Sequence, residues 1–372
     1  MRKMRYSIIG FGGIAENRIA REGFGLDKSR FNGHPEAELA GVTDISQARQ
    51  ESAAKLGLKW YDSAEQVIDD SQVEAVFIAT NNLSHAPIAE QAIQAGKHCL
   101  VEKPMATTLE DAERLRQLAR QKNVSLAVDH MMTENVYNQR AKELVKQGAI
   151  GEVNDVCLHM EFLYGAAQQE AASWRCSNPD ELGGPIGDVG SHCLYMAEFL
   201  LDSDVTSLAC VYAPRTLDIK VENGALIQFR LTNGIQGTVR VAFNQPRGGL
   251  GSTLTNLGYE IYGTEGIVRG YGTLFQLSGH EGEPVDIRLE VDHFKDVETV
   301  KIKQVQNIYQ AVISRHARSI TDNKPLDAAD AIGNLRLILA CHKSAKANGK
   351  TVHLEKQDSS RRRPPRADSR QA

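Results

Sequence analysis

Cysteines are scarce in this chain, and their spacing does not indicate a disulfide framework or a metal site. The 372 residues include six cysteines, with no Cys-x-x-Cys pair and none placed with a histidine at zinc-finger spacing. Isolated cysteines of this kind are expected to be reduced, partly buried thiols. They are Cys99, Cys157, Cys176, Cys193, Cys210 and Cys341.

Long apolar runs and a strong charge imbalance are also absent. The longest apolar runs, Ala75–Thr80 and Leu194–Leu201, fall well short of the roughly 20 residues that cross a membrane, so we expect no membrane span. A formal net charge of -4 gives no electrostatic case for binding nucleic acid. The N-terminus leads within a few residues into a predicted strand, with no cleavable apolar leader, which predicts a cytoplasmic protein.

The length of the chain predicts two domains, because one hydrophobic core usually serves at most roughly 250 to 300 residues. In residues 1–130, short apolar runs alternate with amphipathic stretches, the pattern of β-α-β units around a parallel sheet. We therefore predict an α/β protein with an N-terminal Rossmann domain. Its predicted strands are Arg5–Ile9, Glu38–Thr43, Ala75–Ala79, His98–Val101 and Ser125–Val128, and its clearest helices are Ser84–Ala95 and Leu109–Lys122.

Residues 131–356 are predicted to form a second α/β domain with a large, mostly antiparallel sheet. After a helix over Asn138–Gln147, strand-like segments return by turns, and Asn233-Gly234 marks a hairpin. A long helix over Ala328–Ala347 closes the domain. A broad sheet with one open face often forms a subunit interface, so we expect a homo-oligomer. The predicted strands are Val153–Leu163, Ser207–Tyr212, Ala225–Leu231, Ile235–Phe243 and Gly258–Tyr262.

Two polar segments lie outside these predicted elements. Residues 23–34 form an insertion before the second strand, which either shapes a pocket near a cofactor or is a bare surface loop. Residues 357–372 contain prolines and show no periodicity, so we predict a disordered tail. Its arginine cluster, which begins at Arg361, offers contact with an acidic partner, but a solvated tail is the simpler interpretation.

A glycine-rich turn follows the first predicted strand directly and opens a helix. In the order G-x-G-x-x-A, the first glycine permits a tight turn, the second lets the backbone approach a pyrophosphate, and the alanine lets the helix pack close to the strand. The helix N-terminus favours the negative diphosphate. A plain packing turn is the alternative. The turn predicts a cofactor site formed by Gly10, Phe11, Gly12, Gly13, Ile14 and Ala15.

Asp44 stands at the end of the second predicted strand, where a carboxylate accepts hydrogen bonds from ribose hydroxyls. The same carboxylate repels a 2′-phosphate, and no Arg or Lys lies between Asp44 and Arg49 to neutralise one. The sequence therefore favours NAD over NADP.

The end of the third predicted strand adds polar residues to the same edge of the sheet. Ligands bind at the carboxyl ends of parallel strands, so Thr80, Asn81 and Asn82 are predicted to contact the diphosphate or the nicotinamide ribose. His85 is a further candidate, although Ser84 and His85 equally suit a simple helix start.

The fourth predicted strand leads into Glu102-Lys103-Pro104, which delivers a lysine to the edge of the cofactor crevice. The proline restricts Lys103 to extended geometry, and Glu102 can position its ammonium group. The alternative is an ordinary surface lysine.

Asp188 and His192 are four residues apart before an apolar helix over Cys193–Leu201, so on a helix they share one face. Oxidation of an alcohol by a nicotinamide needs a base for the hydroxyl proton and a positive charge beside the alkoxide. His192 suits the first role and Lys103 the second, with Asp188 supporting either; which of the two takes the proton stays open. A buried structural His192 is the alternative.

The combined motifs resemble the Gfo/Idh/MocA family of NAD(P)-dependent oxidoreductases over residues 4 to about 355. The resemblance implies that Lys103, Asp188 and His192 form the catalytic set, that Trp174 and Arg175 line the substrate pocket, and that substrates are sugars, inositols or related polyols. It also implies dimers or tetramers formed through the C-terminal sheet. The motifs are the glycine turn, Glu102-Lys103-Pro104, Gly148-x-x-Gly151, Trp174-Arg175, Gly183-Gly184-x-x-x-Asp188-x-Gly-x-His192 and Gly263-Thr-Glu-Gly266.

Two departures from the family pattern bear on the substrate. Where relatives often carry an arginine after the fifth strand, this chain has Asp129 and His130, which either bind substrate hydroxyls or satisfy loop backbone. Tyr195 stands where an acidic or amide residue is common. Asp129, His130 and Glu134 make a poor metal site without a fourth ligand, so no metal is expected. Besides a dehydrogenase, a cofactor-retaining glycosidase or epimerase and a non-catalytic NAD-binding regulator remain alternatives.

Overall fold

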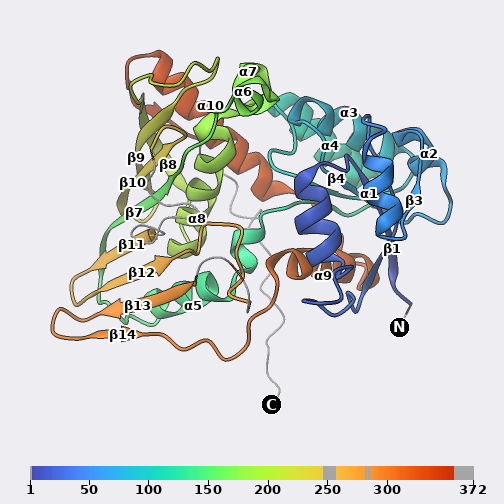
Figure 1. Cartoon of the computed structure of the whole chain (residues 1–372). Coiled ribbons are helices and arrows are strands. Elements are labelled where there is room, and N and C mark those ends of the chain that lie inside the picture. The colour runs from blue at the N-terminus through green and yellow to red at the C-terminus, as the bar shows by residue number, and fades with distance from the viewer. Residues whose placement is uncertain (1, 246–256, 281–282, 284–285, 356–372) are drawn as a thin grey trace.

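The computed structural model describes residues 2–245, 257–280, 283 and 286–355. Two β-sheets form separate lobes, and helices cover them and fill the space between them (Figure 1). The α/β fold expected from the sequence is confirmed. The segment predicted to be a disordered tail, 357–372, lies outside the described residues.

The first sheet has six parallel strands in the order β3-β2-β1-β4-β5-β6. The five predicted strands are present, and β3 is an additional edge strand of two residues that pairs with β2. Strand order reverses between β1 and β4, which is where open α/β sheets bind ligands. The strands are β1 Met4–Ile9, β2 Ala37–Thr43, β3 Lys59–Trp60, β4 Ala75–Ile78, β5 His98–Val101 and β6 Leu126–Val128.

Helices cover both faces of this sheet. The glycine turn opens η1, Ala15–Gly23, which is a π-helix rather than an α-helix. Helix α9, Ile308–Thr321, packs beside η1 on the same face, although it comes more than 170 residues after the last strand of the sheet (Figure 1). A Cβ at Gly23 would lie 2.9 Å from Cδ1 of Ile313, so glycine allows this close approach. The other helices are α1 Arg49–Lys55, α2 Ala64–Asp69, α3 Asn82–Gln94 and α4 Leu109–Lys122.

The second sheet has nine strands in the order β14-β13-β12-β11-β7-β10-β9-β8-β15. Every described pairing is antiparallel except that of β7 with β10, as expected for a mostly antiparallel sheet. The strands are β7 Val153–Glu161, β8 Val205–Tyr212, β9 Gly224–Leu231, β10 Gln236–Ala242, β11 Leu257–Gly263, β12 Ile267–Tyr271, β13 Arg288–Asp292, β14 Val297–Thr299 and β15 Val352–His353.

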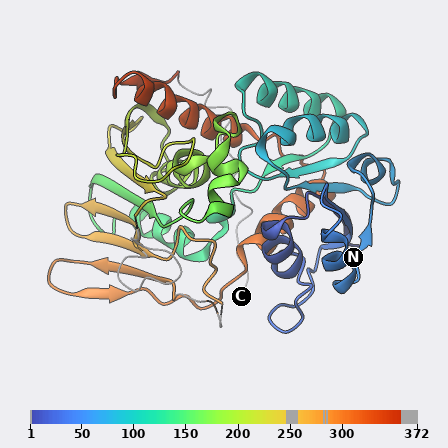
Figure 2. The same ribbon diagram turned by 45° about the horizontal axis from the view of Figure 1, so that its top comes forward.

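Helices pack against the inner face of the second sheet, between it and the first lobe (Figure 2). They are α5 Val136–Lys146, α8 Ser191–Leu201, α10 Ala329–Lys346 and the short η4 Ile186–Gly190. The other short helices of this part of the chain are η2 Met131–Glu134, α6 Gln168–Ala172, α7 Trp174–Ser177 and η3 Pro179–Glu181. Among the described residues, no helix is long and apolar enough to cross a membrane.

Two glycine motifs of the second domain contact each other. The backbone N–H of Glu265 donates to the carbonyl of Ile150 at 2.9 Å, and that of Thr264 donates to the carbonyl of Glu152 at 2.9 Å. Gly151 has a φ of +71°, and a Cβ there would lie 2.3 Å from the Thr264 hydroxyl. These motifs therefore join the start of β7 to the β11–β12 turn.

Candidate active site

The glycine turn between β1 and η1 leaves open space where a dinucleotide diphosphate would lie. Gly10 has a φ of +93°, and a Cβ there would lie 2.7 Å from the carbonyl carbon of Ala79. By contrast, a Cβ at Gly12 or Gly13 would meet no atom within 4 Å. Phe11, between the first two glycines, is 0% exposed and belongs to the hydrophobic core. The turn thus has the shape that a dinucleotide requires.

Asp44 follows β2 and is partly exposed at the same edge of the sheet. One of its carboxylate oxygens accepts a hydrogen bond from the Ser46 N–H at 2.8 Å, which fixes its direction. Arg49 lies 3.5 Å from Glu16 on η1, so the Arg49 guanidinium forms an ion pair with that carboxylate. The Asp44 carboxylate is therefore the charged group at the carboxyl end of β2, and the charge of Arg49 is directed to Glu16 instead.

The residues after β4 are tied to the second domain by Glu181, which the sequence analysis did not identify. Its side chain accepts hydrogen bonds from the Asn81 amide at 2.5 Å and from the Leu83 N–H at 2.8 Å, while its backbone carbonyl accepts from Asn82 at 2.6 Å. Glu181 is 3% exposed. These bonds hold the start of α3 against η3, so Asn81 and Asn82 have a role in joining the two domains.

His85 lies inside the protein between two turns at the edge of the first sheet. Its ring nitrogens contact the carbonyl oxygens of Pro104 at 2.8 Å and Thr80 at 3.1 Å. The side chain is 0% exposed, and burial lowers its pKa. It therefore fixes the turn after β4 to the turn after β5.

Lys103 reaches from the end of β5 across to the second domain. Its ammonium group donates to the backbone oxygen of Asp188 at 2.6 Å and to the carboxylate of Asp188 at 3.2 Å. Burial raises the pKa of Asp188, but the charges of Lys103 and Arg175 outweigh burial and lower it to about 2. Asp188 is thus ionised at neutral pH and holds a cation at the junction of the two domains.

His192 follows Asp188 on the next helical turn, in α8, and lies within the field of the same charges. Burial and the positive charge of Lys103 hold the pKa of His192 well below its ordinary value. Its Nδ1 is 2.8 Å from the hydroxyl of Tyr195, which orients the ring. The ring of Tyr195 in turn stacks on His130, with ring centroids 4.4 Å apart. The sequence showed Tyr195 only as a departure from the family pattern. Its hydroxyl contact with the His192 ring makes it a positioning residue for His192.

Asp129, for which the sequence left two roles open, lies inside the protein at the end of β6. It is 0% exposed, and neither carboxyl oxygen has a hydrogen-bond partner among the described residues. It follows β6 directly beside Glu102, which follows β5. Burial raises the pKa of both carboxyl groups, and raises that of Asp129 well above its ordinary value. Glu134 is likewise buried, 3.4 Å from Arg315.

Glu222 supports the segment that carries Asp188. Its side chain is almost completely buried against Gly184, where an added Cβ would lie 2.7 Å from the carboxyl oxygen. The same oxygen accepts a hydrogen bond from the Ile186 N–H at 2.9 Å, at the start of η4. Burial raises the pKa of Glu222 from 4.5 to about 7.

We expect Glu222→Gln to stabilise the protein above neutral pH. Because the folded-state pKa of about 7 exceeds the ordinary 4.5, the stability that Glu222 provides is complete below about pH 4.5 and is lost as pH rises through about 7. Glutamine keeps the oxygen but does not ionise, so the gain at pH 8 is at most about 3 kcal/mol. Thermal unfolding between about pH 5 and 8 measures it. The exposed Glu298→Gln is the control, and a gain that does not change with pH contradicts the assignment.

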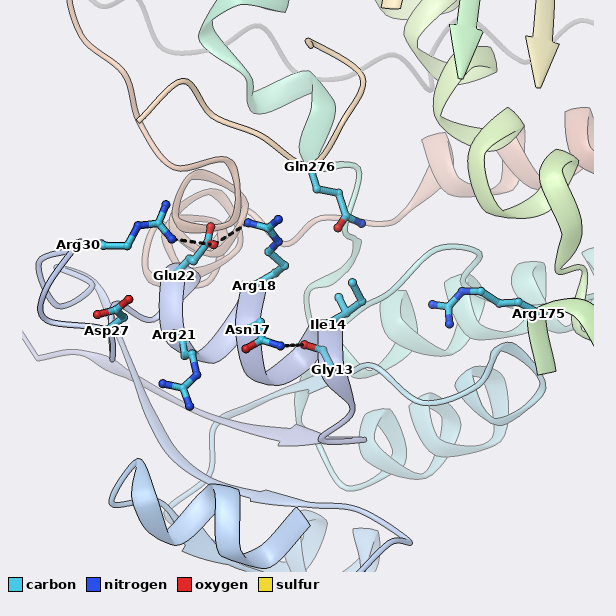
Figure 3. A pocket seen from close by; sticks show the side chains of 10 residues that line it. All are labelled: Gly13, Ile14, Asn17, Arg18, Arg21, Glu22, Asp27, Arg30, Arg175 and Gln276. Carbon is cyan, nitrogen blue, oxygen red and sulfur yellow. Dashed lines mark hydrogen bonds and ion pairs between the residues drawn. The ribbon is translucent and has the colours of Figure 1, made fainter. Parts of the chain in front are cut away.

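Trp174 and Arg175 lie on α7 at the mouth of the site. The Arg175 guanidinium stacks 4.3 Å above the Trp174 ring, and its Nε is 3.5 Å from the Asp188 carboxylate. Arg175 also lines a pocket of about 560 Å³ that runs along η1 (Figure 3). Among the described residues, no group of three or more His, Cys, Asp or Glu is placed to hold a metal ion.

Comparison with known families matches both halves of the chain. Residues 4–130 match the model described as "Oxidoreductase family, NAD-binding Rossmann fold", and residues 138–269 match the model described as "GFO/IDH/MocA C-terminal domain".

Several relatives with assigned activities act on sugars or inositols. The chain is 29% identical to 1,5-anhydro-D-fructose reductase of Ensifer adhaerens over 270 residues, 72% of this chain and 77% of that protein. It is 26% identical to scyllo-inositol 2-dehydrogenase (NADP(+)) of Bacillus subtilis over 90% of this chain and 94% of that protein. Two other curated sugar oxidoreductases are matched over 54% and 56% of their own length.

A solved structure with the same fold is that of aldose-aldose oxidoreductase from Caulobacter crescentus in complex with glycerol. It superimposes with a TM-score of 0.79 over 95% of this chain and 100% of that chain, at 22% identity. The likeness extends over both sheets, so it supports the two-lobed architecture described above.

Proposed function

The chain belongs to the Gfo/Idh/MocA family of oxidoreductases acting on sugars and related compounds, and we propose that it uses NAD to interconvert a secondary alcohol and a carbonyl of a sugar, inositol or related polyol. In this proposal, residues 1–130 hold the cofactor and residues 131–356 present the substrate. The observation that carries it is the contact of Lys103 Nζ with Asp188. This contact brings the ammonium group of the first domain to η4 of the second domain, and η4 leads directly into α8, which holds His192.

The cofactor would be held along the edge of the first sheet. Gly10, Phe11, Gly12, Gly13, Ile14 and Ala15 would hold the diphosphate, Asp44 the adenosine ribose, and Thr80, Asn81, Asn82 and Glu102 the nicotinamide ribose. His85 would act indirectly, through the two turns that it joins. When bound, the nicotinamide exchanges a hydride with the carbinol carbon of the substrate.

His192 and Lys103 have different roles in the proposed reaction, one toward the proton and one toward the charge on the substrate oxygen. A histidine whose pKa lies well below its ordinary value is neutral at neutral pH and can accept a proton from a hydroxyl group. Lys103 already donates to two oxygens of Asp188, and the same donors can stabilise the charge on a substrate oxygen. Asp188, Trp174, Arg175 and His130 would complete the pocket. We therefore assign proton acceptance to His192 and alkoxide stabilisation to Lys103.

The preference for NAD over NADP is assigned to Asp44. We expect Asp44→Ser to lower kcat/KM with NAD and raise it with NADP, changing the ratio by at least about tenfold, because a repulsive charge beside the 2′-phosphate is removed. Initial rates with both cofactors measure the ratio. Asp62→Ser, which removes an exposed carboxylate elsewhere in this domain, is the control. A ratio that does not change in Asp44→Ser contradicts the assignment.

The reaction class is tested by a substrate panel of inositols, aldoses, ketoses and glycosides with NAD and NADP. The proposal predicts net NADH formation, read at the nicotinamide absorbance, with at least one of them. Product without net NADH would instead indicate a cofactor-retaining glycosidase or epimerase. Cofactor binding without turnover of any compound would indicate a regulator.

Oligomerisation through the second sheet remains part of the proposal. Val211 and Leu226 are paired neighbours on β8 and β9, and both side chains are exposed on the sheet surface. Exposed apolar side chains on a broad sheet suit a symmetric contact between two copies. Light scattering of the purified protein distinguishes a dimer or tetramer from a monomer.

A further inference from the structure

The pocket along η1 is formed by both domains. Figure 3 shows Arg18 and Arg21 on η1 and Arg30 on the following loop, with Gln276 and Arg175 reaching in from the second domain. Its volume is about 560 Å³, several times that of one phosphate group. Gly13 and Ile14 of the glycine turn lie between the arginines of η1 and Arg175 (Figure 3), and Arg175 lies 3.5 Å from Asp188. The pocket therefore adjoins the residues proposed to carry the reaction.

Positive charge predominates in the lining of this pocket. Four arginines line it, of which Arg21 is paired with Glu16 at 2.9 Å and Arg175 lies 3.5 Å from Asp188. Arg18 and Arg30 instead share the single carboxylate of Glu22, and a bound anion would balance the positive charge that Glu22 leaves. Guanidinium groups suit phosphate oxygens because each presents several donors in one plane.

The guanidinium groups of Arg18 and Arg30 are held in place before any ligand binds. Glu22, 5% exposed, lies 2.7 Å from Arg18 and 3.6 Å from Arg30. The amide of Asn307, on the segment before α9, donates to the other oxygen of Glu22 at 2.9 Å. A buried carboxylate that fixes two arginines on the wall of a pocket lowers the entropy cost of binding an anion there.

We propose that this pocket binds a phosphoryl group carried by the substrate away from the carbon that is oxidised, with Arg18 and Arg30 as its main ligands. This inference rests on the proposed function. The cofactor does not account for Arg18 and Arg30, because Asp44, at the ribose end of the cofactor site, is not among the lining residues, and both arginines lie beyond Gly13 and Ile14, on η1 and the loop that follows it (Figure 3). The substrate is thus a phosphorylated sugar or polyol rather than a neutral one.

The first test compares phosphorylated and neutral substrates in Arg30→Gln. We expect the ratio of kcat/KM for a hexose monophosphate to kcat/KM for the neutral hexose to fall at least about tenfold, because a charged ligand to the phosphate is lost. Lys28→Gln removes one positive charge from the same loop outside the lining and is expected to keep the ratio. A nucleoside diphosphate hexose tested in parallel distinguishes a diphosphate substrate from a monophosphate. An unchanged ratio in Arg30→Gln, or an equal loss in Lys28→Gln, overturns the inference.

The second test does not depend on turnover. Calorimetric titration with inorganic phosphate is expected to give saturable binding to the wild-type protein and at least tenfold weaker binding to Arg18→Gln/Arg30→Gln. Absence of phosphate binding overturns the inference while the proposed function stands. If the protein binds phosphate but converts no sugar, the proposed function fails and the pocket remains an anion site. If Arg30→Gln weakens NADH instead, the pocket serves the cofactor and the inference is wrong.

Discussion

Lys103→Met is expected to lower kcat by about a thousandfold while leaving the protein folded and able to bind NADH. Methionine keeps much of the length of the side chain but removes the cation that lies 3.2 Å from the Asp188 carboxylate. Loss of positioned electrostatic stabilisation costs roughly 10² to 10³ in rate, and loss of assistance to proton transfer adds to it. Steady-state rates measure kcat, and NADH fluorescence titration measures cofactor affinity.

Two further variants control this experiment. Arg175 remains 3.5 Å from Asp188 in Lys103→Met, so Asp188 keeps a positively charged neighbour and the melting temperature should change little. Lys103→Arg retains the charge with different donor geometry, and we expect it to recover only part of the rate. The exposed Lys122→Met is expected to behave as wild type. A kcat within tenfold of wild type in Lys103→Met excludes Lys103 from the chemistry.

Gly12→Ala is expected to weaken NADH binding by about a hundredfold without changing thermal stability. A Cβ at Gly12 meets no protein atom within 4 Å, so the methyl group does not disturb the folded chain. It would instead occupy the space in which the diphosphate approaches the backbone, where small displacements have large effects on ligand geometry. Fluorescence titration with NADH and a thermal unfolding curve measure the two properties separately.

Gly10→Ala, unlike Gly12→Ala, should lower the thermal stability of the protein. A Cβ there lies 2.7 Å from the backbone of Ala79, and the φ of +93° is unfavourable for alanine, so stability falls. Gly57→Ala provides a matched control, because Gly57 has a φ of +69° but its Cβ would meet nothing within 4 Å. A lower melting temperature in Gly12→Ala, or unchanged NADH affinity, would contradict the role assigned to the open turn.

The local sequence pattern was sufficient to predict most elements of the fold. Apolar runs bounded by helices identified β1, β2, β4, β5 and β6, because buried parallel strands are continuously apolar. Strand β3 was missed because it contains only Lys59 and Trp60 and lies at the edge of the sheet, where it pairs with β2 alone. The position of α9 beside η1 was not predictable either, since it depends on contacts between segments almost 300 residues apart.

Residues of the candidate site were likewise predicted where the local sequence fixes their position, and missed where it does not. Lys103 was found because a strand end fixes its place, and Asp188 and His192 because their spacing puts them on successive helical turns. Glu181 and Glu222 were missed, since each acts through burial beside a residue distant in sequence, and the complete burial of Asp129 was not predictable from its neighbours in the chain. The contact of Tyr195 with His192 was predictable in principle, because residues three apart are neighbours on a helix.

The most direct test of the account follows a deuterium label from the substrate carbon that is oxidised. The best substrate of the panel, carrying deuterium at that carbon, is converted by the wild-type enzyme in the presence of NAD, and the reduced cofactor is analysed by mass spectrometry. The account predicts one deuterium in each NADH formed, and almost no labelled NADH with His192→Ala or Lys103→Met. Unlabelled NADH, or labelled NADH formed at an undiminished rate by both variants, would contradict it.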